Sequence, residues 1–115
     1  QWAVAVDPVT GPPAVHLYDR DADRLEPFYV TRPELEGAPL VPMEPVEIRA
    51  RDGLTLVSYL SRPLGQQGPA PMVLLVHGGP WARDHHGYNP YHQWLANRGY
   101  AVLSVNFRGS TGFGK

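Results

Sequence analysis

The chain has 115 residues, of which 43% are hydrophobic and 18% are charged, and its net charge is −1. This composition is ordinary for one globular domain, and it has no excess of one charge that would favour nucleic acid or an anionic membrane surface. No apolar run reaches the roughly 18 residues of a membrane-spanning helix. The absence of cysteine excludes a disulfide framework and a thiolate metal site, and it fits a reducing compartment such as the cytoplasm.

The first 45 residues are typical of short strands joined by turns. Strands are expected at 2–6, 14–18 and 25–30, with the third at a sheet edge because Pro27 cannot donate a hydrogen bond to a neighbouring strand. The turns between them are rich in Pro, Gly and Asp, so the pattern predicts an antiparallel meander. Residues 31–45 are rich in proline and predict a linker or a surface crossing.

The pattern changes after residue 45. Residues 46–50 and 54–61 predict a hairpin, because the Arg-Asp-Gly sequence between them is a strong turn signal. Residues 72–77 are mostly apolar, which is typical of a strand buried on both faces of a sheet. A short helix is expected at 91–98, and a last buried strand at 100–105, so residues 72–105 predict a βαβ unit with parallel strands.

The expected helix has recognisable boundaries. Asn89 is suited to cap its N-terminus, and Pro90 is suited to its first position. Gly99 is a natural terminator. The ends of the whole sequence are less regular, since it begins inside a predicted strand without Met and finishes in a glycine-rich loop. We therefore expect a segment of a longer protein.

The strand at 72–77 leads into His-Gly-Gly-Pro-Trp at 77–81. Two glycines let the backbone turn sharply and approach another molecule, and open α/β sheets bind ligands at the carboxyl ends of their strands. Gly78 and Gly79 are therefore candidate catalytic residues, whose N–H groups can hold the oxyanion of a tetrahedral intermediate. A tight connection without any function explains the same motif equally well. Trp81 is the aromatic residue best suited to line a substrate pocket.

A second glycine-rich loop, residues 106–114, follows the last predicted strand. If the two strands are parallel neighbours, both loops lie on one rim of the sheet. Arg108 is a candidate substrate-binding residue there, although structural support of the loop is the interpretation we favour. Residues 109–112 fall short of the G-x-S-x-G nucleophile motif, so no catalytic serine is assigned. Three further serines lie in predicted strands and are poor candidates: Ser58, Ser61 and Ser104.

Neither of two polar clusters predicts a metal site. The histidines at 77, 85, 86 and 92 have neither the helical H-E-x-x-H spacing nor that of a zinc finger. The aspartates at 19, 21 and 23 lack the Gly and Glu that complete a calcium loop, and they predict a solvated hairpin turn instead. No metal and no cofactor are expected.

Residues 77–81, followed by Val-Asn-Phe-Arg-Gly-Ser-Thr-Gly-Phe-Gly at 105–114, resemble the prolyl oligopeptidase family of serine peptidases. The similarity is greatest to its acylaminoacyl-peptidase and dipeptidyl-aminopeptidase branch. It covers residues 46–115 well and 1–45 more weakly. It implies an α/β fold in which 1–45 are the last strands of a β-propeller blade and a linker, and 46–115 are the N-terminal part of an α/β-hydrolase peptidase domain.

The resemblance also implies roles. Gly79 would donate its N–H to one half of the oxyanion hole, and the residue after the nucleophile would supply the other half. The family's Ser, Asp and His would all lie beyond Lys115, so the 115-residue piece is expected to be inactive alone. Its third hydrolase strand would have an open, aggregation-prone edge. The implied partners are a peptide substrate and the remainder of the parent chain, without nucleic acid or membrane, and a homo-oligomer is left open.

Three functions are compatible with these motifs. The leading one is a serine peptidase that releases acyl-amino acids or dipeptides from peptide N-termini through an acyl-enzyme. The first alternative is an esterase or other acyl hydrolase of the α/β-hydrolase fold. The second alternative is a non-catalytic binding module.

Overall fold

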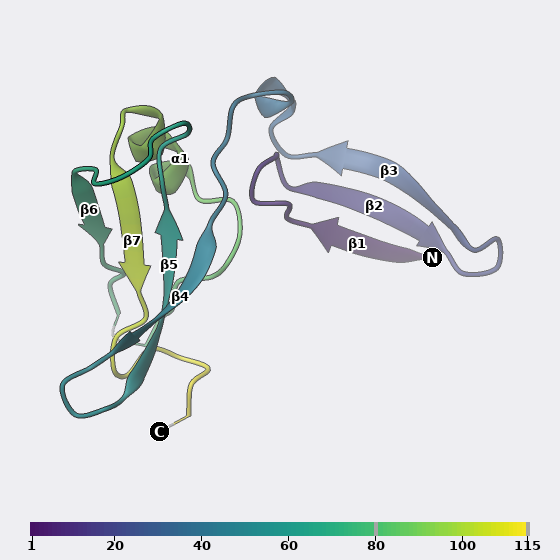
Figure 1. Ribbon diagram of the computed structural model, residues 1–115. Helices are drawn as coiled ribbons and strands as arrows, with labels where there is room; N and C mark the ends of the chain where they lie inside the picture. The colour runs from purple at the N-terminus through teal and green to yellow at the C-terminus, as the bar shows by residue number, and fades with distance from the viewer. Residues whose placement is uncertain (80, 115) are drawn as a thin grey trace.

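The computed structural model describes residues 1–79 and 81–114, and this part of the chain forms two β-sheets, one α-helix and one 3₁₀ turn (Figure 1). Pro80 and Lys115 lie outside the described residues. The elements in chain order are β1 (Trp2–Val6), β2 (Ala14–Asp19), β3 (Arg24–Val30), η1 (Pro33–Leu35), β4 (Glu44–Arg49), β5 (Thr55–Ser61), β6 (Met72–Leu75), α1 (Pro90–Asn97) and β7 (Ala101–Val105).

The first sheet is an antiparallel meander in the order β1-β2-β3, as the sequence predicts. Pro27 lies in the edge strand β3 opposite His16, beside a register shift between Val15 and His16. Edges and bulges are where a strand tolerates a residue without an N–H. The expected aspartate turn is also confirmed, since the Asp19 carboxylate accepts the N–H groups of Asp21 and Ala22 between β2 and β3.

The second sheet has the order β4-β5-β7-β6. Strands β4 and β5 form the predicted hairpin, and Gly53 in its turn has a φ of +88°, which favours glycine. Strand β7 pairs antiparallel with β5 and parallel with β6. The predicted βαβ unit is therefore confirmed. Because β6 and β7 are parallel, the turns that follow them begin at the same end of the two strands (Figure 1).

Helix α1 begins and ends where its capping residues predict. The Asn89 side chain accepts the N–H groups of Tyr91 and His92 at 2.9 and 3.2 Å, and Pro90 is the first helical residue. Gly99 has a φ of +87°, and its N–H bonds to the Ala96 carbonyl. No helix within the described residues has the length and hydropathy needed to cross a membrane.

Strand β6 differs from the sequence prediction. It is the edge strand of its sheet and spans only 72–75, and Met72 and Leu74 are each 56% exposed. The prediction that this stretch is buried on both faces is therefore wrong for the chain as described. Its apolar residues fit a two-sided environment, but β7 is its only strand neighbour within residues 1–79 and 81–114. The open edge expected from the family resemblance is confirmed.

The buried core lies where the turn after β1 meets the second sheet. Val9 packs with Met43 and Tyr59. The Gln93 side chain on α1 bonds to the carbonyl of Val9 and to both backbone groups of Val41. These contacts join the two sheets and fix α1 against them.

Candidate functional site

The glycine turn follows the carboxyl end of β6 and is exposed. Gly79 has a φ of +151°, and a Cβ atom there would lie 2.9 Å from the Trp81 nitrogen. Both the dihedral angle and the close approach therefore require glycine at this position. Gly78 has open space around its Cα. Neither glycine N–H donates a hydrogen bond to any residue in 1–79 or 81–114.

His77 lies beneath this turn and connects it to the loop after β7. Its Nδ1 is 2.8 Å from the Gly78 carbonyl oxygen, and its Nε2 is 2.9 Å from the Ser110 hydroxyl. The ring stacks on Phe107, with 4.4 Å between ring centroids. Ser110 is only 4% exposed, so this contact is shielded from water.

Further contacts hold the two loops together. The Asn106 carboxamide accepts the Asp84 N–H at 2.8 Å and donates to the Asp84 carbonyl at 3.2 Å. The Thr111 N–H donates to the Ala82 carbonyl at 3.0 Å. The expectation that both glycine loops lie on one rim of the sheet is therefore confirmed, and the two loops form one bonded unit.

The Asp84 carboxyl is unusual within this unit. Its Oδ2 is buried and has no hydrogen-bond partner among the described residues. Burial raises the pKa of this carboxyl, while nearby His77 and His85 oppose the shift. A partly desolvated carboxyl beside two imidazoles is a common feature of functional sites, although structural networks show it as well.

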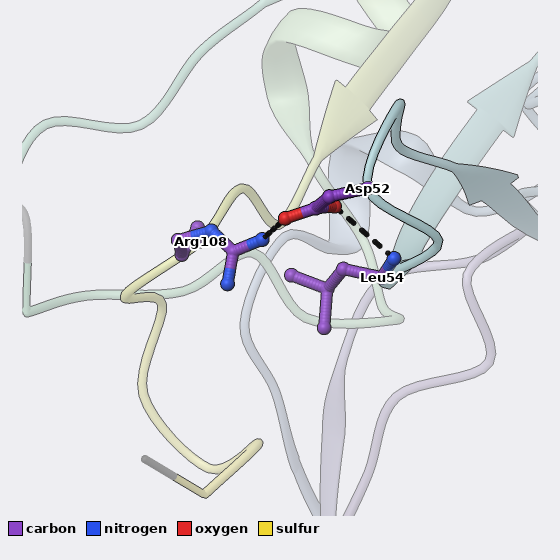
Figure 2. A network of polar contacts seen from close by, with 3 residues as sticks. All are labelled: Asp52, Leu54 and Arg108. Carbon is purple, nitrogen blue, oxygen red and sulfur yellow. Dashed lines mark hydrogen bonds and ion pairs between the residues drawn. The ribbon is translucent and has the colours of Figure 1, made fainter.

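Arg108 and Trp81 have separate surroundings in the structure. The Arg108 guanidinium forms an ion pair with Asp52 in the β4–β5 turn, and Asp52 also accepts the Leu54 N–H (Figure 2). Arg108 lines a cleft of about 200 Å³ between β5 and the 106–114 loop, whose described lining includes Ser110 but neither Gly79 nor Trp81. Trp81 is 84% exposed.

The remaining polar candidates have structural partners. His92 is fully buried, and its ring nitrogens lie 2.9 and 2.8 Å from the hydroxyls of Ser61 and Ser104. Burial lowers the pKa of His92 to about 4. His86 Nε2 lies 2.9 Å from the Met43 carbonyl oxygen. Within residues 1–79 and 81–114, no three metal-ligating side chains converge on one point.

Sequence reasoning missed the roles of Asn106 and Ser110. Both follow β7, and both are buried, at 3% and 4% exposure. The available signal was the parallel pairing itself, which places polar residues after one strand beside the turn after its neighbour. The sequence pattern indicates for His77 no more than a place among the histidines and before the turn, whereas the side chain contacts both loops.

Known proteins similar to this chain are peptidases. It is 58% identical over 122 residues to dipeptidyl aminopeptidase BIII of Pseudoxanthomonas mexicana, covering 99% of the chain and 18% of that protein. It is 43% identical over 136 residues to dipeptidyl peptidase family member 6 of Caenorhabditis elegans, again with 99% and 18% covered. No family model matches the chain.

A solved structure gives the same result for the fold. The acylaminoacyl peptidase of Pyrococcus horikoshii superposes with a TM-score of 0.75 at 23% identity, over 96% of this chain and 18% of that one. The chain thus spans about a fifth of the length of its relatives. The fold and the relatives show that this chain is similar to one segment of such peptidases. The chain belongs to the prolyl oligopeptidase family, in the branch of dipeptidyl and acylaminoacyl peptidases, as its sequence motifs indicate.

Proposed function

We propose that the full-length protein carrying this chain is a serine peptidase that releases dipeptides or acyl-amino acids from peptide N-termini. The observation that carries the proposal is the Gly78-Gly79 turn. It presents two amides without partners among the described residues at the carboxyl end of a parallel strand, and the backbone conformation at Gly79 is one that only glycine fits. The relatives named as dipeptidyl aminopeptidase and acylaminoacyl peptidase support the same reaction class.

In this proposal the Gly79 N–H is one donor of the oxyanion hole. The attacking serine converts the scissile carbonyl into a tetrahedral intermediate with a negative oxygen, and an oriented amide stabilises that charge more than it stabilises the substrate carbonyl. The second donor is the residue after the nucleophile. The nucleophilic Ser, the Asp and the His come from chain beyond Lys115, so this segment alone is inactive.

The proposed domain organisation assigns β4–β7 to the first four strands of an α/β-hydrolase sheet. The strand order β4-β5-β7-β6 and the open edge of β6 support this assignment, because a further strand can pair there. Residues 1–45 are proposed to end a β-propeller. The first sheet leaves Trp2 58% and Phe28 67% exposed, as a blade does before its neighbours cover it.

The remaining proposals concern substrate and setting. Trp81 is proposed to contact the substrate because its ring is exposed next to the glycine turn. Arg108 is kept as a second substrate contact, with its ion pair to Asp52 as the competing explanation. The substrate is a peptide, and the proposed location is the cytoplasm, for which the absence of cysteine is the support.

The test uses the full-length protein with three substrate sets: dipeptidyl p-nitroanilides, acyl-amino-acid p-nitroanilides and short-chain p-nitrophenyl esters. We expect hydrolysis of at least one anilide set, with a phosphonate-sensitive nucleophile. Hydrolysis of the esters alone would contradict the peptidase proposal and support the alternative, an esterase of the α/β-hydrolase fold. The absence of hydrolysis of all three would favour a non-catalytic module.

A further inference from the structure

The contacts of His77 define where its proton lies. A carbonyl oxygen only accepts hydrogen bonds, so the 2.8 Å contact with Gly78 requires a proton on Nδ1 of His77. In the neutral ring Nε2 then has no proton and accepts the hydroxyl proton of Ser110 across 2.9 Å. The two contacts are compatible with one tautomer, which the Gly78 carbonyl selects and which the Ser110 hydroxyl supports by donating to the unprotonated Nε2.

This tautomer determines the direction of the Gly79 amide. In a trans peptide, the C=O of one residue and the N–H of the next point in opposite directions. When His77 holds the Gly78 carbonyl, the Gly79 N–H of the same peptide must point away from the imidazole ring. That N–H has no partner among the described residues, which agrees with an outward orientation.

Several contacts support His77 and the loop that carries Ser110. The Ser110 N–H donates to the Phe107 carbonyl at 3.0 Å, and the Phe107 ring stacks on His77 with an interplanar angle of 21°. The bonds between Asn106 and Asp84 hold the second loop against the first on the other side. Ser110 is buried and bonded, which is unsuitable for a nucleophile but suitable for fixing a neighbour.

We infer that Ser110 and His77 are positioning residues, which together direct the Gly79 amide toward the oxyanion that forms during catalysis. The inference rests on the proposed peptidase function. Ser110 acts through His77, and His77 acts through the Gly78 carbonyl. Because both residues act through the Gly78–Gly79 peptide, their loss should affect the transition state more than substrate binding.

The kinetic test compares Ser110→Ala with Thr111→Ala in the full-length protein. Thr111 is the matched control because its side chain is exposed and its backbone bond to Ala82 is retained in the variant. We expect Ser110→Ala to lower kcat about tenfold with little change in KM, and to weaken a peptide aldehyde inhibitor by a similar factor. Thr111→Ala should match the wild type. Equal kinetics for the two variants would overturn the inference.

A double-mutant cycle tests whether the two residues act in series. His77→Phe removes both hydrogen bonds and retains a ring to stack on Phe107. The combined variant should be no slower than His77→Phe alone, because Ser110 then has nothing to orient. Independent, multiplicative losses would contradict the inference. Ser110→Cys, which keeps a weak donor, should recover part of the rate, and circular dichroism checks that each variant is folded.

A final measurement does not depend on activity. In the full-length protein labelled with ¹⁵N-histidine, the NMR spectrum should show His77 protonated at Nδ1, and Ser110→Ala should mix the two tautomers. An Nε2-protonated His77 in the wild type would overturn the inference even if peptides are hydrolysed. Conversely, a wild type that hydrolyses no peptide would remove the proposed function, while the change in tautomer populations between the wild type and Ser110→Ala would still decide whether Ser110 orients His77.

Discussion

Two histidines in this chain are each bonded to serine hydroxyls, and they have opposite consequences. His92 on α1 packs against the second sheet and is fully buried. Its two ring nitrogens form hydrogen bonds with the hydroxyls of Ser61 and Ser104. His77 lies at the rim, bonds Ser110 with one nitrogen and uses the other to hold the Gly78 carbonyl.

The difference lies in what the second nitrogen holds. Around His92 the ring nitrogens and both serine hydroxyls are paired inside the protein, so we expect this cluster to act on stability. Around His77 the bonded carbonyl belongs to a peptide whose N–H has no partner among the described residues. The same residue types therefore hold buried structure in one place and, in the proposed function, orient a binding group in the other. The following predictions are designed to separate these two roles.

The largest effect is expected at the rim, for Gly79→Ala. Its added Cβ would lie 2.9 Å from the Trp81 nitrogen, and the φ of +151° is strained for alanine. Displacement of the amide should reduce kcat by about 10²–10³. Steady-state kinetics of the full-length protein measure this loss.

Gly78→Ala is the comparison for this variant. Gly78 has open space where the Cβ would be, so the backbone can remain in place and the loss of kcat should be at least tenfold smaller. Similar losses for both variants would show that the turn tolerates no side chain at all, and the case for the Gly79 amide would fail.

At the buried histidine, His92→Leu should affect stability and not chemistry. It leaves the hydroxyls of Ser61 and Ser104 buried without their partner, which should lower the free energy of unfolding by about 2–4 kcal/mol. The folded variant should keep the wild-type kcat well below its melting temperature. Thermal melting and kinetics at 20 °C test the two halves, and a large kcat loss in a fully folded His92→Leu would contradict the separation.

The same histidine gives the fold a pH dependence. Burial lowers the pKa of His92 from 6.5 to about 4, so the unfolded chain takes up the proton first. The stabilisation is complete above the unfolded pKa and is lost as the pH falls toward the folded pKa. Between pH 7 and pH 5 this site should remove about 2 kcal/mol. Urea midpoints of the wild type and His92→Gln measure it, and equal pH slopes for both would exclude His92 as the cause.

The sequence predicted most of the fold because its signals were local. The ends of α1 lie where Asn89, Pro90 and Gly99 predict them, and the Asp-Gly sequence forms the expected hairpin turn. The environment of β6 was predicted wrongly, because an apolar stretch reports what a strand prefers and not which neighbours are present. The bonds of His77 to Ser110 and of Asn106 to Asp84 were not predictable, since they join residues 33 and 22 positions apart through side-chain geometry.

The smallest effect is expected for the exposed ion pair between Arg108 and Asp52. Both side chains are more than half exposed, so solvent screens the pair and its coupling should stay below about 1 kcal/mol in a double-mutant cycle. If Arg108 serves only this loop, Arg108→Ala and Asp52→Ala should both leave KM within about twofold, because screened surface pairs contribute little beyond their own loop. A several-fold rise in KM for Arg108→Ala alone, relieved by Arg108→Lys, would instead assign the guanidinium to substrate binding. The comparison thus decides whether the second glycine loop contributes only the groups that hold His77, or a charge that the substrate meets directly.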